Sequence, residues 1–565
     1  MKKIVASLLT FAMLLSVCTG CSSGSENTST TTTTTTASDQ QGSSASDSDV
    51  TKTAIGEYTA ENPYQLTFAF IEFYPQDDGE RQAVEDALNE YMIPNYHMQV
   101  NFLPMQVSDY ATKLQLMFSG TDDLDVMPVF NSNASSWVNM GAIEDLTPYM
   151  STEDGQKIVE ALGKEKAYVG QMNGILYALP ANKESASLTG LCMRADICDE
   201  LGLTEKYGLG DDVYTGKVYD WSVCADIFQA VKEAHPEITP LYLQGSQSQA
   251  GYMGYFDILL DNFGVLDWEK DHDSLTVVNK YETDTYKDIV TMLAQWYDAG
   301  YIYPDAVTDT QGSAALMKSG SIFSYLSPLK PGFLAEANTT NGRECYAMYF
   351  GQDVETGLRT DNVLYYSTAI ASNSKDPEMA FKFVTALYTD PTVMNYWQFG
   401  IEGTDYQVLD DGTAYYADGV DATNYKYFQN SGWAMGNQFI GYVWNNGTKD
   451  ATYWDKLIDR DEWAYYSPAY GFAWDSSDYQ TEITALKSAL DTYRAALETG
   501  SVGGAENVPA VLEQLNSALY AAGLQDVMDA KQEQLDAWIE ENGPTKTPEV
   551  NLEKINSVTT GVLTE

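Results

Sequence analysis

Five polar or aromatic side chains follow two apolar segments of the N-terminal half that are predicted to be strands. They are Tyr74, Gln76, Asp77, Asn131 and Asn133. Amides and carboxylates can hydrogen-bond the hydroxyl groups of a sugar, and a flat Tyr ring can pack on the C–H face of the sugar ring. Ligands of parallel α/β sheets lie beyond the carboxyl ends of the strands. We therefore expect these residues to line a binding site, and capping of the two loops is the alternative role.

The residue types that catalysis usually requires are sparse or lack a pattern. The chain has only three His, in different segments, and no CxxC pair, so a zinc site, a His-dependent triad or thioredoxin-like chemistry is unsupported. Carboxylate pairs suited to glycoside hydrolysis are unavoidable among 81 acidic residues and carry no information. The cluster Asp267, Asp271 and Asp273 does not match a calcium loop. We expect no catalytic residue, no metal and no cofactor.

Composition limits the possible partners. The formal net charge of −50 argues against nucleic acid, whose phosphates require clustered Lys and Arg. The 565 residues are enough for two or three domains, and a hydrophobic content of 44% indicates a globular protein. The 40 Tyr and 11 Trp must pack largely in the core, yet their number also suits stacking on sugar rings.

Apolar periodicity alternates between that of strands and that of helices, which predicts an α/β fold with mainly parallel sheets covered by helices. Strands are expected at 65–70, 97–102, 125–130, 187–193, 238–243, 321–326 and 363–371. Helices are expected at 81–91, 109–118, 195–201, 221–234, 285–297, 376–389, 481–497, 511–522 and 527–541. Asp410-Asp411-Gly412 predicts a hairpin turn. The last third is thus helical, with apolar stripes that are expected to dock on the rest of the chain.

The N-terminus predicts export. Ile4–Val17 is almost wholly apolar and too short to span a membrane, as in the core of a signal peptide. The tetrapeptide at 18–21 resembles a bacterial lipobox, with Cys18 at the position where Leu is usual. Residues 22–50 are polar and suit a disordered stalk. We expect lipidation of Cys21 and anchoring at the extracellular face of the cell membrane, and a cleaved signal with incidental Cys residues is the alternative.

Three stretches together resemble a known family. They are Gly174–Pro180, which leads into Lys183 and Glu184; Ala369–Ser372 with Asp376–Phe383; and Gly400–Tyr406. In this order, and after a lipoprotein-like N-terminus, they resemble the extracellular solute-binding lipoproteins of ABC importers. The resemblance is to the carbohydrate-binding (family 1) type, and within it to the large lipoprotein subgroup.

The resemblance implies a two-lobed periplasmic-binding-protein-like fold of type II, with a hinge and a helical C-terminal region. The implied divisions are a signal peptide at 1–20, a lipidated Cys and stalk at 21–60, an N-terminal lobe of 61–182 plus 321–372, a C-terminal lobe of 183–320 plus 373–542, and a tail at 543–565. One crossing between the lobes is expected at Lys183 and Glu184, and a second around Gly320–Tyr325.

The resemblance also implies further residues in the cleft between the lobes. They are Lys183, Glu184, Tyr252, Tyr255, Tyr325, Ser327, Trp474 and Asp475. Among these, Trp474 is the strongest candidate for stacking on a sugar ring. Trp296 and Trp538 lie on helix stripes and are expected to be core residues. Glu402 and Tyr406 belong either to the edge of the cleft or to a turn.

The implied function is capture of a small solute and its delivery to the permease subunits of an ABC transporter. An oligosaccharide is favoured, while peptides and other solutes stay open. The protein is expected to be a monomer that contacts the membrane through its N-terminal lipid. The alternatives are a secreted glycan-active enzyme and a glycan-adhesion lipoprotein. The state of the remaining Cys residues, at 192, 198, 224 and 345, also stays open.

Overall fold

The computed structural model describes residues 58–74, 76–120, 123–186, 188–210, 219–245, 253–309, 311–350, 356–445 and 449–557. The expected signal segment, Cys21, the stalk up to residue 57, and Tyr252 lie outside these residues. Within the described part, no helix is long and apolar enough to cross a membrane. Cys192, Cys198, Cys224 and Cys345 are free thiols, and all four are buried.

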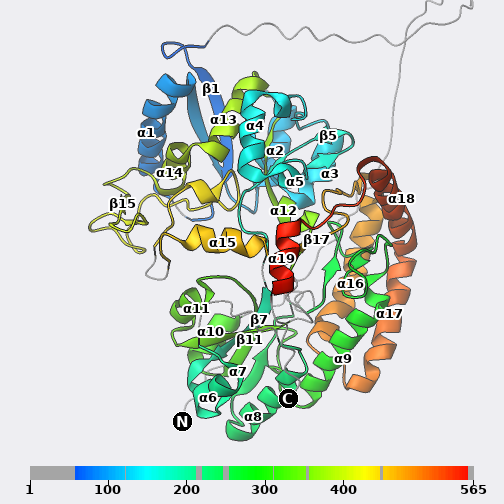
Figure 1. Cartoon of the computed structure of the whole chain (residues 1–565). Helices are drawn as coiled ribbons and strands as arrows, with labels where there is room; N and C mark the ends of the chain where they lie inside the picture. Colours follow the sequence, from blue (N-terminus) through cyan, green and yellow to red (C-terminus); the bar gives the residue numbers. More distant parts are fainter. Residues whose placement is uncertain are drawn as a thin grey trace, which may run out of the picture. The chain divides into compact units, whose positions relative to one another are not determined.

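A five-stranded sheet organises the first lobe (Figure 1). Its strands, in spatial order, are β2 (Met98–Met105), β1 (Tyr64–Ile71), β3 (Val126–Phe130), β14 (Tyr366–Ile370) and β6 (Leu179–Pro180). β1 pairs in parallel with both β2 and β3, whereas β14 runs antiparallel to β3 and β6. The carboxyl ends of β1 and β3 therefore meet the start of β14 at one edge of the sheet.

Helices cover both faces of this sheet, because alternate residues of β1 are buried on opposite sides. Phe68 packs on one side, with its ring 5.0 Å from Phe383 and 5.6 Å from Trp397. Ala69 belongs to the cluster on the other side, which includes Trp137. The helices are α1 (Asp78–Tyr96), α4 (Glu153–Leu162), α13 (Pro377–Thr389) and α14 (Pro391–Phe399) on the Phe68 side, and α2 (Tyr110–Ser119), α3 (Asn131–Asn139) and α12 (Thr360–Leu364) on the other.

A four-stranded sheet organises the second lobe. Its order is β12 (Cys345–Phe350), β7 (Leu188–Arg194), β11 (Ile322–Leu329) and β8 (Thr239–Tyr242). β7 is antiparallel to both β12 and β11, and β11 is parallel to β8. The helices that accompany it are α6 (Ala195–Glu200), α7 (Leu203–Tyr207), α8 (Val223–Ala234), α10 (Ser313–Ser319) and α11 (Phe333–Asn341).

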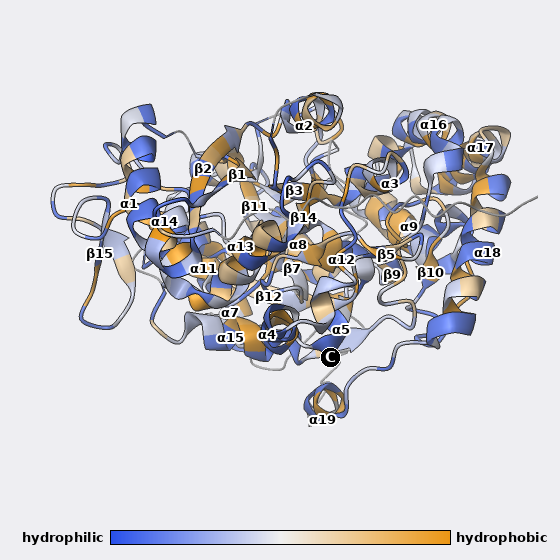
Figure 2. Ribbon diagram, turned by 90° about the horizontal axis from the view of Figure 1, so that it is seen from above, coloured by the Kyte–Doolittle hydropathy of each residue, from blue (hydrophilic) through white to orange (hydrophobic). Residues whose placement is uncertain are grey.

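The C-terminal helices pack on the second lobe. α16 (Gln480–Glu498) and α17 (Val508–Ala521) lie beside α9 (Asp284–Asp298) in Figure 1, and α18 (Leu524–Asn542) packs on α16 and α17. Their buried Leu residues join the same apolar cluster as the strands and helices of the second lobe. Figure 2 shows hydrophilic residues along much of α18 and hydrophobic residues on β1 and β2 of the first sheet. The predicted docking role of the three helical stripes is confirmed.

The remaining elements are short. They are α5 (Lys164–Ala167), β4 (Gln171–Met172), β5 (Ile175–Leu176), β9 (Phe256–Asp257), β10 (Leu266–Asp267), β13 (Thr356–Leu358), β15 (Tyr406–Val408), β16 (Ala414–Tyr416), α15 (Tyr453–Asp461), β17 (Ala464–Tyr466) and α19 (Glu549–Ser557). β15 and β16 pair antiparallel around Gly412, whose φ of 83° suits glycine, so the predicted hairpin is confirmed.

The chain divides between the sheets differently from the predicted boundaries. β11 and β12 belong to the second sheet, although 321–372 was expected in the first lobe, because β11 pairs with β7 over Ser324–Leu329. The return to the first sheet therefore follows Phe350 and is not at Gly320–Tyr325. α13 and α14 pack against the first sheet, although 373–542 was expected in the second lobe.

Two segments have more helix than expected. The stretch after β3 was expected to be a loop, but it is the helix α3, and Asn131 is its first residue. No helix was predicted in the tail at 543–565, yet it contains α19. The tail contacts α15 and β17 through hydrogen bonds from Asn551 to the Asp461 and Ala464 carbonyl oxygens and through ion pairs of Lys554 with Asp459 and Glu462.

Candidate functional site

Five aromatic rings gather where β1 and β3 end and β14 begins. This group, termed here the aromatic platform, consists of Phe73, Phe130, Tyr365, Tyr366 and Trp433. The Trp433 ring lies 4.7 Å from Phe73 and 5.0 Å from Tyr366. Tyr366 in turn lies 4.9 Å from Phe130 and 4.7 Å from Tyr365. Tyr365 is 57% exposed and the other four are partly exposed, so the group presents ring surface to solvent.

The backbone explains why these rings meet. Tyr366 and Phe130 are register partners of the antiparallel β14–β3 pair, and Phe73 lies two residues beyond the end of β1. Trp433 comes from a long irregular segment after the β15–β16 hairpin, which polar side chains hold in place. Gln398 accepts a hydrogen bond from the Gly432 amide at 3.0 Å, and Gln429 donates to the Ile71 carbonyl oxygen. A side chain at position 432 would press on the end of the Gln398 side chain, which would then have to move.

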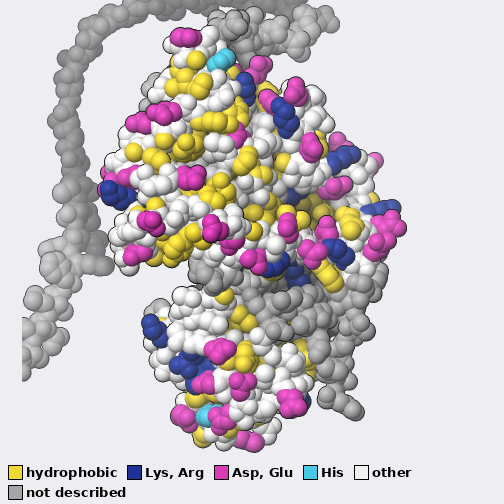
Figure 3. Space-filling model, turned by 60° about the vertical axis from the view of Figure 1, so that its left-hand side comes forward, with side chains coloured by type: hydrophobic (Ala, Val, Ile, Leu, Met, Phe, Trp, Pro, Cys, Tyr) yellow, Lys and Arg dark blue, Asp and Glu magenta, His cyan; other side chains and the backbone are white. Residues whose placement is uncertain are grey.

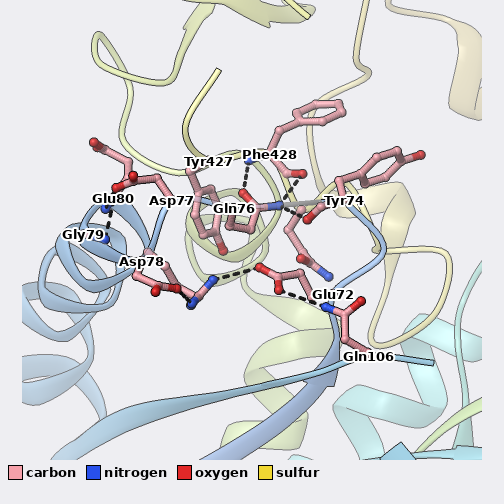
Figure 4. Close-up of polar contacts among 12 residues, drawn as sticks. Glu72, Tyr74, Gln76, Asp77, Asp78, Gly79, Glu80, Gln106, Tyr427 and Phe428 are labelled. Atoms are coloured by element: carbon pink, nitrogen blue, oxygen red, sulfur yellow. Dashed lines mark hydrogen bonds and ion pairs between the residues drawn. The ribbon is translucent and has the colours of Figure 1, made fainter. Parts of the chain in front are cut away.

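The loop after β1 divides into a structural part and an exposed part (Figure 4). The Gln76 amide donates to the Phe428 carbonyl oxygen at 2.8 Å and accepts from the Phe428 amide at 2.6 Å. Asp77 caps α1 by accepting from the Gly79 and Glu80 amides at 3.1 and 3.0 Å. Tyr74 is 39% exposed and projects away from the α1 N-terminus. Of the three predicted residues, Gln76 and Asp77 position the loop, whereas Tyr74 is exposed and its contact with a solute stays a prediction.

The predicted Asn residues lie beside the platform. The backbone N–H of Asn131 donates to the Tyr365 carbonyl oxygen at 3.4 Å, so this partly exposed residue lies next to the most exposed ring of the platform. The side-chain oxygen of Asn133 accepts a hydrogen bond from the Tyr110 hydroxyl. Tyr110 also packs on Phe130 at 4.5 Å. Asn133 is therefore linked to the platform through Tyr110.

A second part of the site lies at the first crossing between the sheets. The segment Lys183–Ala186 lines a cavity of about 370 Å³ together with Ser327, Pro328, Lys330 and Phe333. We call this cavity the crossing pocket. The backbone links it to the platform, because the Ala181 amide donates to the Tyr366 carbonyl oxygen at 3.0 Å. The predicted pair Lys183 and Glu184 is thus brought together with Ser327.

An ion pair spans the crossing pocket. Lys330 lies 3.2 Å from one Glu184 oxygen, and the Gln438 amide donates to the other at 2.7 Å. Burial favours a raised pKa of Glu184, but the charges of Lys330 and Lys183 outweigh it and hold the pKa below its usual value. Burial likewise opposes the charge of Lys330, and Glu184 raises the pKa of that ammonium well above its usual value. Both groups are therefore charged at neutral pH.

Tyr255 and Tyr325 lie elsewhere in the second lobe. Tyr255 lines a separate cavity of about 440 Å³ with Trp221, Asp267 and Asp288. The Tyr325 hydroxyl accepts from Asn341 at 3.1 Å, and its burial raises the pKa. The structure therefore brings neither residue to the platform.

Trp474 does not present a stacking surface in this structure, contrary to the prediction. Only 2% of the residue is exposed, and it packs in the core of the C-terminal helices, with Lys531 Nζ 5.5 Å from the ring. The core role expected for Trp296 is confirmed, since it is 4% exposed, and Trp538 packs against the same cluster. Glu402 is exposed, whereas Tyr406 is buried in β15.

Asp475 is a junction rather than a cleft residue. Its carboxylate accepts from Ser135 at 2.7 Å and from Asn139 and Asn173 at 2.9 Å each. Its backbone exchanges two hydrogen bonds with the Gln534 amide of α18. Burial works against ionisation, but the hydrogen bonds from Ser135 and Asn173 hold the pKa of Asp475 below its usual value. The residue therefore ties α3 and the β4–β5 turn to the C-terminal helices.

Sequence reasoning missed Trp433, Tyr365 and Tyr366 as site residues. Tyr365 and Tyr366 lie inside the strand predicted at 363–371, but β14 begins only at Tyr366, and its antiparallel pairing with β3 places Tyr366 beside Phe130. Another cavity, of about 700 Å³, is lined by Lys166, Asp461 and Asn551, and none of the predicted residues lines it.

Comparison with known proteins identifies two matching family models. The model of the bacterial extracellular solute-binding proteins matches residues 86–402. A second model, described as a domain of unknown function (DUF3502), matches residues 468–540. The second match covers most of α16, α17 and α18.

Individual relatives cover most of the chain. A carbohydrate ABC transporter substrate-binding protein from Streptococcus pneumoniae is 24% identical over 455 residues, which are 76% of this chain and 82% of that protein. The crystal structure of the N-glycan transport solute binding protein (NgtS) from the same species superposes with a TM-score of 0.68 at 21% identity, covering 84% of this chain and 99% of that one. An extracellular solute-binding protein from Bifidobacterium longum subsp. infantis gives 0.54 at 14% identity, with 85% and 100% coverage.

The structural neighbours confirm the predicted two-lobed α/β fold with its helical C-terminal region. The matching family consists of binding proteins rather than enzymes. Because the family model spans more than half of the chain, this chain belongs to the bacterial extracellular solute-binding proteins.

Proposed function

We propose that this protein captures an oligosaccharide between its two lobes and delivers it to the permease of an ABC importer. The observation that carries the proposal is the aromatic platform, a row of partly exposed rings at the ligand-binding edge of the first sheet. Aromatic faces pack well on the C–H faces of sugar rings. Several neighbouring rings, as here, suit a ligand of several sugar units.

The named relatives support the same substrate class. One is called a carbohydrate ABC transporter substrate-binding protein, and structures of NgtS were determined in complex with Man1GlcNAc and Man5GlcNAc. Both ligands were bound to NgtS, which is 21% identical to this chain. For this chain they favour an oligosaccharide as the first ligand to test.

Binding is coupled to closure of the lobes. Trp433 and Tyr74 belong to the first lobe, whereas Ser327 and Phe333 reach the crossing pocket from the second. A ligand that contacts both sets of residues binds the closed state more tightly than the open state. It shifts the equilibrium between the open and closed states by the difference between these two binding free energies. The permease then distinguishes the closed form from the open one.

The location of the protein follows from the same proposal. A diacylated Cys21 and a flexible polar stalk hold the binding lobes, as a monomer, near a permease in the same membrane. The lipobox-like tetrapeptide and the low-complexity tract after it support this arrangement. Replacing Cys21 with Ser is expected to release the protein into the medium, and membrane retention of that variant would contradict the anchor.

A thermal-shift screen tests the proposed ligand class. Bound ligand raises the apparent stability by about 2.7 kcal/mol at a concentration of 100 times its Kd. The panel contains monosaccharides, neutral and acidic oligosaccharides and a peptide pool. We expect stabilisation by at least one oligosaccharide. Stabilisation by the peptides alone would overturn the carbohydrate assignment.

A further inference from the structure

We infer that Lys183 in the crossing pocket binds an acidic group on the captured glycan, so that the preferred substrates are acidic oligosaccharides. This inference rests on the proposed function and adds the substrate class to it. The acidic group is a sugar carboxylate or a sulfate ester, since both present charged oxygens to an ammonium.

The first step of the argument is the pairing of charges around the crossing pocket. Three of the four nearby Lys residues have an acidic partner. The pairs are Lys330 with Glu184 at 3.2 Å, Lys449 with Glu336 at 2.8 Å, and Lys166 with Asp461 at 3.9 Å. Among the residues that the structure describes, no carboxylate forms an ion pair with Lys183. These seven side chains therefore carry a net charge of +1.

A local excess of positive charge is unexpected in this chain. Acidic residues outnumber basic ones by 81 to 31, so a random set of charged side chains would be negative. Figure 3 shows this excess on one face of the molecule, where Asp and Glu are spread widely among fewer Lys and Arg. The composition of the chain gives no reason for an ammonium that lines a cavity without a carboxylate at ion-pair distance among the described residues.

The hydrogen bonding of Lys183 leaves room for a ligand. Its ammonium has three N–H groups, and one of them donates to the Glu184 carbonyl oxygen at 2.8 Å. This bond fixes the side chain at the wall of the crossing pocket. The lining residues Ser185, Ser327 and Phe333 offer two hydroxyls and an aromatic edge beside it. A carboxylate in the pocket would accept from Lys183 and find Glu184 already neutralised by Lys330.

The size of the pocket fits one sugar unit with its acidic substituent. Its volume of about 370 Å³ lies at the lower end of the range for small-molecule sites. The aromatic platform is connected to it through residues 181–183 and lies outside it. We therefore assign the acidic unit to the crossing pocket and the neutral remainder of the oligosaccharide to the platform.

The test compares matched acidic and neutral probes on the full chain. The probes are a sialylated glycan with its desialylated form, a sulfated oligosaccharide with its unsulfated form, and sodium sulfate alone. Affinities are measured by calorimetry for the wild type, Lys183→Met, Lys183→Arg and the control Lys287→Met. Lys287 is exposed on α9 and outside the crossing pocket, so its replacement removes the same charge at a distance.

We expect the wild type to prefer an acidic probe over its neutral form by about 10- to 100-fold, the usual contribution of a charge-assisted hydrogen bond. Lys183→Met should abolish the preference, whereas Lys183→Arg and Lys287→Met should keep it. Equal affinity for acidic and neutral probes, or a preference that survives in Lys183→Met, would overturn the inference and leave the proposed function intact. If sodium sulfate binds but no acidic oligosaccharide is preferred over its neutral form, the pocket is an anion site unrelated to glycans and the inference is overturned. Failure of every oligosaccharide would overturn the proposed function itself.

Discussion

Replacement of Lys531 with Met tests how the C-terminal helices are held on the second lobe. Lys531 is fully buried in α18, and its ammonium lies 2.6 Å from Asp261. It also donates to the carbonyl oxygens of Phe263 and Gly264 at 2.9 and 3.1 Å. Methionine keeps most of the apolar stem but removes the charge and all three hydrogen bonds. The variant therefore leaves the Asp261 carboxylate without its counterion.

The expected loss of stability is about 3 to 5 kcal/mol, the usual cost of removing one partner of a buried ion pair. Adding Asp261→Asn should recover a large part of it, because a neutral amide is cheaper to bury than a carboxylate. In the wild type, burial raises the pKa of Asp261 and Lys531 partly offsets this. Without Lys531 the folded pKa rises further above the unfolded value. The deficit of the variant should therefore be larger at pH 8 than at pH 5.

The assay is urea unfolding followed by the total tryptophan fluorescence, to which Trp474 contributes with its ring 5.5 Å from Lys531 Nζ. Lys487→Met serves as the control, since that residue is exposed on α16. A deficit below about 1 kcal/mol, within the range of surface pairs, would refute the assignment of this ion pair as the anchor of α18. An equal deficit in the double variant would refute the role of the stranded carboxylate.

Three further predictions concern the junctions and a titrating group. Removing residues 544–565 deletes the contacts of Asn551 and Lys554 with α15 and β17, so amide exchange should accelerate in 453–466, while unchanged exchange would contradict this role. Asp475→Ala leaves four donors without their acceptor and should cost about 1 to 2 kcal/mol in urea unfolding, whereas Asp475→Asn, which keeps one oxygen, should cost less. Burial raises the pKa of Asp405 to about 6, above its unfolded value of about 3.9. The wild type should therefore lose stability as the pH rises from about 4 to about 6, and Asp405→Asn should lose less. Parallel pH profiles of the free energy of unfolding for the two proteins would contradict this prediction.

The alternation of strands and helices could be predicted because it depends on local signals. The apolar stretch of β1 and the Asp376-Pro377 start of α13 are sufficient to place these elements. The position of Tyr74 beyond β1 followed from the strand-end rule, and Lys183 and Glu184 followed from the crossing motif. Each of these depends on residues that are close together in the sequence.

The errors arose where distant residues decide the outcome. Trp433 lies in an irregular segment without periodicity, and its place depends on Gln398 and on contact with Phe73, which is 360 residues earlier. Trp474 is a residue type that often stacks on sugar rings, but packing against α18 buries it. The strand at β11 was assigned to the wrong lobe because an apolar strand does not specify its pairing partner, here β7.

The central claim is that the aromatic platform binds an oligosaccharide, and calorimetric titration of the best oligosaccharide from the screen tests it most directly. The titration compares the wild type with Trp433→Leu and with Trp463→Leu, a partly buried Trp outside the platform. We predict saturable binding that weakens by about 30-fold or more in Trp433→Leu, as for a central aromatic contact, and that is unchanged in Trp463→Leu. Undiminished affinity in Trp433→Leu, or no binding of any oligosaccharide by the wild type, would contradict the claim.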